Sequence, residues 1–140
     1  MKQIRRDTFE TNSSSTHSLT MVDKSDFTEW KNGKLYFDGN SRFLTYDEVI
    51  EELKKSKYYC NDIICQPGFD PSKWDEYQET GDEYIFMNYE NVDDALAGEY
   101  EYYTYNEYWE RYDCYETFER TYKTKSGDEV VAFGHYGYDN

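Results

Sequence analysis

The clearest pattern of apolar and polar positions lies over residues 46–57 and predicts an amphipathic helix. Thr45 precedes this segment and Glu48 follows three residues later, which is the arrangement of a capping box at a helix N-terminus. The apolar side chains of the segment recur at helical spacing and share one face, at Tyr46, Val49, Ile50 and Leu53. We therefore expect a helix that buries one face against the rest of the domain.

Weaker signals predict further short helices. Thr104 and Glu107 repeat the capping-box spacing and predict a helix over 105–112. Shorter helices are expected over 25–31 and over 91–97, the latter ended by Gly98.

Alternating apolar positions predict strands, most clearly at the C-terminal end. Residues 115–124 and 129–136 flank the turn pair Ser126-Gly127 and predict a hairpin. Shorter strands are expected at 2–6, 19–22, 34–37 and 83–89, with a polar segment over 7–18. The pattern favours an α+β fold, in which an antiparallel sheet with a C-terminal hairpin is packed by two or three short helices.

Composition indicates one small domain, residues 1–140, with a core of rings. Charged residues make up 32 % of the chain, which is typical of disorder, but the aromatic content of 20 % opposes that interpretation. No apolar run approaches the roughly 18 residues of a membrane helix. The first ten residues, MKQIRRDTFE, lack the apolar stretch of a signal peptide. Acidity opposes direct binding of nucleic acid or an anionic membrane.

The three cysteines indicate a reducing compartment, because an odd number without a signal peptide does not suggest a disulfide framework. A zinc site would need four of five side chains to converge, namely Cys60, Cys65, Cys114, His17 and His135. Paired C-x-x-C spacing is absent, so we expect the thiols to be small buried side chains. No metal ion and no cofactor is expected.

The charge is unevenly distributed. Residues 1–60 carry ten basic and ten acidic side chains, whereas residues 61–140 carry five basic and twenty acidic ones, and so the whole net charge of −15. The window 75–119 holds fifteen carboxylates and ten tyrosines, with Arg111 as its single cation. Such an asymmetry predicts one strongly negative side of the molecule.

This window suggests imitation of a nucleic acid. Each strand of a duplex presents one phosphate per roughly 3.4 Å of axis, and carboxylates three or four residues apart on a helix lie roughly 5–6 Å from one another. Tyrosines add contact area at low entropic cost. The row Glu107, Glu110 and Asp113 has that spacing, and Asp75, Glu76 and Glu79 approach it. The candidate partner-binding residues are Asp75, Glu76, Glu79, Asp82, Glu83, Glu90, Asp93, Asp94, Glu99, Glu101, Glu107, Glu110, Asp113, Glu116 and Glu119.

Two other interpretations of the same window remain open. The carboxylates could form a solvated acidic face that only keeps the chain soluble. Asp93, Asp94, Glu99 and Glu101 could supply oxygen ligands to calcium, although EF-hand spacing is absent.

A run of small polar side chains near the N-terminus is the second candidate site. It comprises Glu10, Thr11, Asn12, Ser13, Ser14, Ser15, Thr16 and His17. Its backbone N–H groups could cradle an anion, or His17 could serve as a base for a neighbouring serine. The competing interpretation is a solvated turn whose hydroxyl groups bond nearby backbone. A ligand site would require these side chains to line one pocket.

Both ends of the chain resemble a known group of proteins. Arg5-Arg6 followed by FETNSSSTHSL at 9–19 resembles the opening of small uncharacterised proteins from phages and prophages of Gram-positive bacteria. The segment VVAFGHYGYD at 130–139 is similar to their C-terminal end. Members of this family more often have glycine where this chain has Asp7. The resemblance implies a viral accessory protein that acts in the cytoplasm of a bacterial host cell.

The charge and the resemblance together favour a phage-derived interaction protein that is not an enzyme. We expect it to inhibit a basic nucleic-acid-binding host protein by mimicry, in the manner of an anti-CRISPR or anti-restriction protein. The expected partner is a defence nuclease, and the chain is expected to be a monomer or a small homo-oligomer. The alternatives are a small enzyme or ligand-binding protein that uses residues 10–18, and an assembly accessory that oligomerises through exposed tyrosines.

Overall fold

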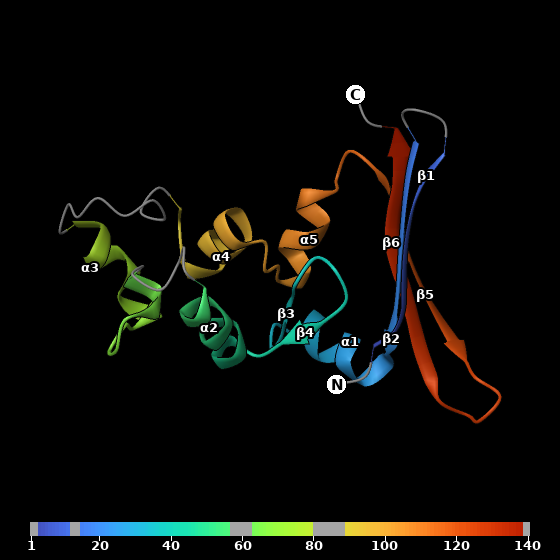
Figure 1. Cartoon of the computed structure of the whole chain (residues 1–140), viewed down its shortest axis with the longest axis horizontal. Helices are drawn as coiled ribbons and strands as arrows, with labels where there is room; N and C mark the ends of the chain where they lie inside the picture. Colours follow the sequence, from blue (N-terminus) through green and yellow to red (C-terminus); the bar gives the residue numbers. More distant parts are fainter. Residues whose placement is uncertain (1–2, 12–14, 57–62, 80–88, 139–140) are drawn as a thin grey trace.

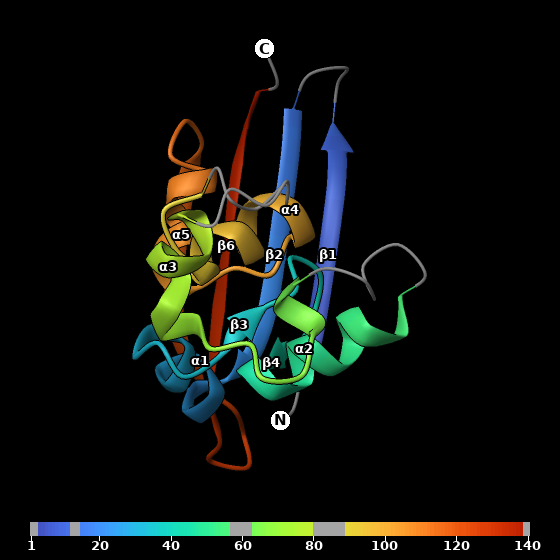
Figure 2. The same ribbon diagram turned by 90° about the vertical axis from the view of Figure 1, so that its left-hand side faces the viewer.

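The computed structural model describes residues 3–11, 15–56, 63–79 and 89–138, and of residues 3–11, 15–17 and 138 it describes the backbone. The α+β class is confirmed. A four-stranded antiparallel sheet has the order β1-β2-β6-β5, with β1 at Gln3–Thr11, β2 at Ser15–Asp23, β5 at Glu116–Lys123 and β6 at Glu129–Tyr138. In Figure 1 the described helices all lie on one side of this sheet, and Figure 2 looks onto that side.

The helical side contains short elements. They are α1 (Lys24–Lys31), β3 (Tyr36–Phe37), β4 (Phe43–Leu44), α2 (Tyr46–Lys55), α3 (Trp74–Glu79), α4 (Val92–Tyr100) and α5 (Tyr105–Arg111). Two 3-10 turns, η1 (Ile63–Cys65) and η2 (Pro71–Lys73), separate α2 from α3.

The N-terminal strands extend further than predicted. The polar segment expected over 7–18 is strand at its two ends, because β1 runs to Thr11 and β2 begins at Ser15. Ser18 and Thr20 are buried on the same face of β2 as Val22. In the register they pair with buried residues of β6, Ser18 with His135 and Thr20 with Phe133. A central position in the sheet therefore outweighs the polar character of these side chains.

The core is built from rings, as the composition indicated. Trp30 is fully buried, and its indole Nε1 donates a hydrogen bond of 3.0 Å to the Tyr103 carbonyl. Six rings surround it at centroid distances of 5.1–5.6 Å: Phe27, Phe37, Phe43, Tyr105, Tyr108 and Phe133. Offset and edge-on ring pairs contribute beyond their buried area. A second apolar cluster joins α2 to α3 and α4 through side chains that include Val49, Leu53, Trp74 and Leu96.

The capping box of α2 is confirmed. The Glu48 N–H donates to the Thr45 hydroxyl at 3.2 Å, and the Thr45 N–H donates to the Glu48 carboxylate at 2.9 Å. The helix ends at Lys55, two residues before its predicted end.

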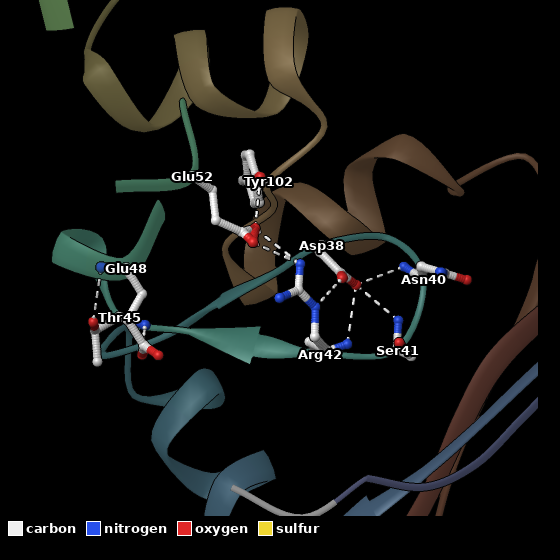
Figure 3. A network of polar contacts seen from close by, with 8 residues as sticks. All are labelled: Asp38, Asn40, Ser41, Arg42, Thr45, Glu48, Glu52 and Tyr102. Carbon is white, nitrogen blue, oxygen red and sulfur yellow. Dashed lines mark hydrogen bonds and ion pairs between the residues drawn. The ribbon is translucent and has the colours of Figure 1, made fainter. Parts of the chain in front are cut away.

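A polar network fixes α2 against its neighbours (Figure 3). Asp38 accepts the backbone N–H groups of Asn40, Ser41 and Arg42, which closes the β3–β4 turn. The Arg42 guanidinium donates to both Glu52 oxygens at 2.8 and 2.9 Å, and the Tyr102 hydroxyl donates to the same carboxylate at 3.1 Å. The turn, α2 and the segment that leads into α5 are thus held together.

The end of α4 corrects a prediction. Gly98 was expected to stop this helix, but it lies inside it, and the helix continues to Tyr100, with Glu101 in the left-handed region at φ 60°. A side chain at position 98 would place its Cβ 2.5 Å from the Tyr89 ring. The glycine therefore serves packing and not termination. Most of the predicted strand 83–89 lies outside the described residues.

Candidate functional site

Helices α3, α4 and α5 of the acidic window lie on the helical side of the sheet, with α3 farthest from the sheet and α5 beside it (Figure 1). We use the name acidic layer for the described carboxylates on and beside α3, α4 and α5: Asp75, Glu76, Glu79, Glu90, Asp93, Asp94, Glu99, Glu101, Glu107, Glu110 and Asp113. Asp82 and Glu83 fall outside the described residues.

Helix α3 presents the first group of carboxylates to solvent. Asp75, Glu76 and Glu79 are exposed, and Asp75 and Glu79 are four residues apart, so they lie on the same helix face. Trp74 anchors the helix, because its buried indole Nε1 donates to the Tyr89 carbonyl at 2.9 Å. This anchor holds α3 against the segment that precedes α4.

Helix α4 contributes a half-buried pair. The Asn91 side chain caps the helix by accepting the Asp94 N–H at 2.8 Å, so Asp93 and Asp94 lie in the first turn, where negative charge is favoured. Asp93 accepts the Tyr36 hydroxyl. Burial, reinforced by that hydrogen bond, raises the pKa of Tyr36, so the phenol stays protonated and keeps donating.

Helix α5 differs from its predicted role. Glu107 is half-buried beside α4 and accepts the Thr104 hydroxyl at 2.9 Å. Burial, reinforced by the charges of Asp93 and Asp94, raises the pKa of Glu107 to about 7. The helix ends at Arg111, so Asp113 lies beyond it. The expected row of three exposed carboxylates is therefore not formed on one helix face.

A shallow hollow of about 350 Å³ separates α4 from α5. Its carboxylates are Asp94, Glu107 and Glu110, and its only cation is Arg111. Tyr89 and Tyr103 also line the hollow. The arrangement can accept a positively charged side chain, but it holds no base paired with a nucleophile.

Tyrosine hydroxyls are frequent carboxylate partners in this chain. Tyr89 donates to Glu99 at 2.7 Å, and Tyr105 donates to Glu119 at 2.9 Å. Tyr36 donates to Asp93, and Tyr136 donates to Glu116. Tyr102 donates to Glu52, which also accepts the Arg42 guanidinium. The hydrogen bond to Glu99 is the main cause that raises the pKa of Tyr89. A neutral donor satisfies a carboxylate without cancelling its charge. These tyrosine–carboxylate pairs were not predicted from the sequence. The alternation of tyrosine and acidic residues along the chain is the signal that could have indicated them.

Two predicted partner-binding residues belong to the sheet instead. Glu119 on β5 lies near α1, with Lys31 Nζ 4.0 Å from its carboxylate. Glu116 accepts the Tyr136 hydroxyl from the adjacent strand. These two carboxylates are therefore separate from the acidic layer.

The metal-ligating candidates do not converge in the described part of the chain, where no group of three or more His, Cys, Asp or Glu side chains could hold an ion. Cys65 is buried as expected, whereas Cys114 is exposed, which corrects its predicted burial. Cys60 lies outside the described residues. The His135 ring stacks on Tyr112 at 3.7 Å, and its Nδ1 lies 3.2 Å from the Tyr108 hydroxyl.

The second candidate site is divided between two strands. Glu10 and Thr11 end β1, and Ser15, Thr16 and His17 begin β2. Because β2 lies between β1 and β6, the backbone N–H groups of Ser15–His17 belong to the sheet ladder. The N–H groups of Ser15, Thr16 and His17 are therefore not free to cradle an anion, whereas Asn12, Ser13 and Ser14 fall outside the described residues.

No protein-family model, curated protein or solved structure matches this chain. None of the helices in the described ranges has the length and apolar character needed to span a membrane.

Proposed function

We propose that this chain is an interaction protein whose acidic layer occupies the basic nucleic-acid-binding surface of another protein. The observation that carries the proposal is that the acidic layer gathers its carboxylates on and beside α3, α4 and α5, with Arg111 as the single cation of the window. On α4, Asp93 and Glu99 accept hydrogen bonds from neutral tyrosine hydroxyls, which leave their negative charge in place. Like charges gathered in this way weaken the fold, a cost that a binding role explains.

The anchoring of the helices supports recognition by surface contact. Trp74 and the Asn91 cap hold α3 and α4, and the capping interaction of Thr104 with Glu107 holds α5. Anchored helices present their carboxylates without losing backbone conformational entropy on binding. A shallow hollow between α4 and α5 suits a lysine or arginine side chain better than an enclosed small molecule.

The target class follows from the chemistry and from the resemblance of both chain ends to phage proteins. A partner must carry rows of lysine and arginine that normally hold phosphates. A host defence nuclease, such as a restriction enzyme or a CRISPR effector, has such a surface and is a protein that a phage gains from blocking. Electrostatic steering would make association fast and sensitive to salt.

The test is capture by the immobilised full chain from a lysate of a Gram-positive bacterium that carries restriction and CRISPR systems. We compare the wild type with E79K/E110K, because both positions are exposed and lie near helix C-termini, where lysine is favoured. The matched control is E29K/E51K, which adds the same charge at exposed positions of α1 and α2.

We expect the wild type and the control to retain basic nucleic-acid-binding proteins at about 50 mM salt and to release them at several hundred millimolar. E79K/E110K should weaken this binding by about tenfold or more. Equal loss in both variants would show that net charge alone is responsible. Failure of the wild type to retain any such protein at low salt would contradict the proposal.

A further inference from the structure

The sheet has one face that the described helices leave uncovered (Figure 1). Val22, Val131 and Phe133 point into the ring core. Strand alternation therefore places their neighbours on the opposite face, which we name the open sheet face and define by Leu19, Met21, Phe118, Tyr122, Ala132 and Tyr136. Ala132 and Val130 belong to neither core cluster, which agrees with this assignment.

This face carries the exposed aromatic surface of the described chain. The large hydrophobic side chains that are exposed among the described residues are Tyr122, at 47 %, and Tyr136, at 38 %, and both lie here. The Phe118 ring lies 6.4 Å from the Tyr136 ring, and its Cζ comes within 3.0 Å of where a Cβ would stand on Gly134. Phe118 and Tyr136 therefore form one aromatic pair over β5 and β6, and Tyr122 lies further along β5 on the same face, beyond Arg120.

The charge distribution identifies a second copy as the occupant. Glu116 and Arg120 are the described charged residues of β5 that share this face, and their charges cancel. The acidic layer lies on the opposite side of the sheet from this face, with α3 farthest from the sheet and α5 packed beside β6 (Figure 1). Two copies that met through their open sheet faces would therefore hold their acidic layers on the two outer sides of the dimer, which lowers the repulsion between chains of charge −15.

The size of the face is sufficient for association. Four strands spaced about 4.8 Å apart, with about 3.3 Å per residue over eight to ten residues, give roughly 500–600 Å² per copy. Two copies would bury roughly 1,000–1,200 Å² in total, which is close to the lower limit of a stable specific interface. The area therefore fits a homodimer of moderate affinity.

We propose that two copies of this chain pack open sheet face against open sheet face, with Phe118, Tyr122 and Tyr136 at the centre of the contact. The dimer would present two acidic layers that point in opposite directions. This inference does not depend on the proposed function, because it concerns the other side of the molecule.

Sedimentation equilibrium of the full chain over a range of protein concentrations tests it. The variants are Y122K/Y136K, which places charge in the contact, and Y122T, which removes a ring but keeps a residue favoured in strands. The matched control is N106K, which adds charge at an exposed position of α5 on the helical side. Circular dichroism checks that each variant is folded.

We expect a wild-type monomer–dimer equilibrium that N106K retains, that Y122T weakens several-fold and that Y122K/Y136K abolishes. Added salt should strengthen the dimer, because it screens repulsion between the copies, whereas it should weaken capture of a basic partner. A wild type that is monomeric at every concentration would overturn the proposal. So would a dimer that survives in folded Y122K/Y136K, since such a dimer uses another surface, such as the edge of β1.

Discussion

Tyrosine resolves a conflict between charge and folding at the level of single residues. A carboxylate near the interior needs hydrogen bonds, and in this chain phenol groups such as Tyr36 and Tyr89 provide them to Asp93 and Glu99. Lysine or arginine would provide the same hydrogen bonds and cancel the charge. The tyrosine content thus serves the core and the acidic surface together.

Glu107 is the residue from which we expect the clearest dependence of folding stability on pH. Its pKa is about 7 in the folded chain, against about 4.3 for an unperturbed glutamate. The folded state therefore binds this proton more tightly than the unfolded state, and stability falls as pH rises from about 4.3 to about 7. E107Q removes this ionisation and preserves a hydrogen-bonding side chain beside Thr104.

We expect urea unfolding to give equal stability for the wild type and E107Q near pH 4, where Glu107 is protonated in the folded state and largely protonated in the unfolded state. Near pH 8 the variant should be more stable by about 1–2 kcal/mol, after allowance for solvent screening. If the free energies of unfolding of the wild type and E107Q changed with pH in parallel, Glu107 would ionise without a cost from burial, which would contradict this prediction.

At the scale of elements, local signals were accurate where they reflect backbone chemistry. The Thr45–Glu48 capping box and the C-terminal hairpin were predicted and are present, because caps and turns are decided by adjacent residues. The length of β1 and β2 could not be predicted, since polar residues before 19, such as Ser18, become strand residues through pairing with distant β6. Inward placement of Glu107 likewise depends on the packing of α4 against α5.

Gly134 on β6 tests this long-range packing. A Cβ at this position would lie 1.9 Å from the Ser18 carbonyl oxygen, which is backbone and cannot move aside without breaking the sheet. We expect G134A to destabilise the chain by roughly 2–4 kcal/mol in urea unfolding.

The matched comparison is G98A in α4. There the added Cβ meets only the outer part of the Tyr89 ring, and alanine is the better helix former. G98A should therefore change the stability by no more than about 1 kcal/mol. A small effect at Gly134, or equal effects at both positions, would contradict the close approach of β2 and β6.

At the scale of the whole molecule, charge and apolar surface are separated. The acidic layer lies on the helical side of the sheet, and the open sheet face is the opposite side (Figure 1). The excess of carboxylates in the window 75–119 was predicted from the sequence. Their distribution between the helices and the sheet was not predicted, since Glu116 and Glu119 lie on β5. One surface is suited to a basic partner and the other to a second copy, so the two associations should respond to salt in opposite directions.

Competition between the chain and nucleic acid for one basic protein distinguishes mimicry from binding at another surface. A basic protein captured by the chain is titrated with labelled duplex DNA at constant ionic strength, in the presence of increasing chain concentrations. Mimicry predicts mutually exclusive binding, so the apparent Kd for DNA rises linearly with the chain concentration. The variant E79K/E110K should have little effect on DNA binding. A complex that holds chain and DNA together, or an unchanged affinity for DNA, would contradict the account.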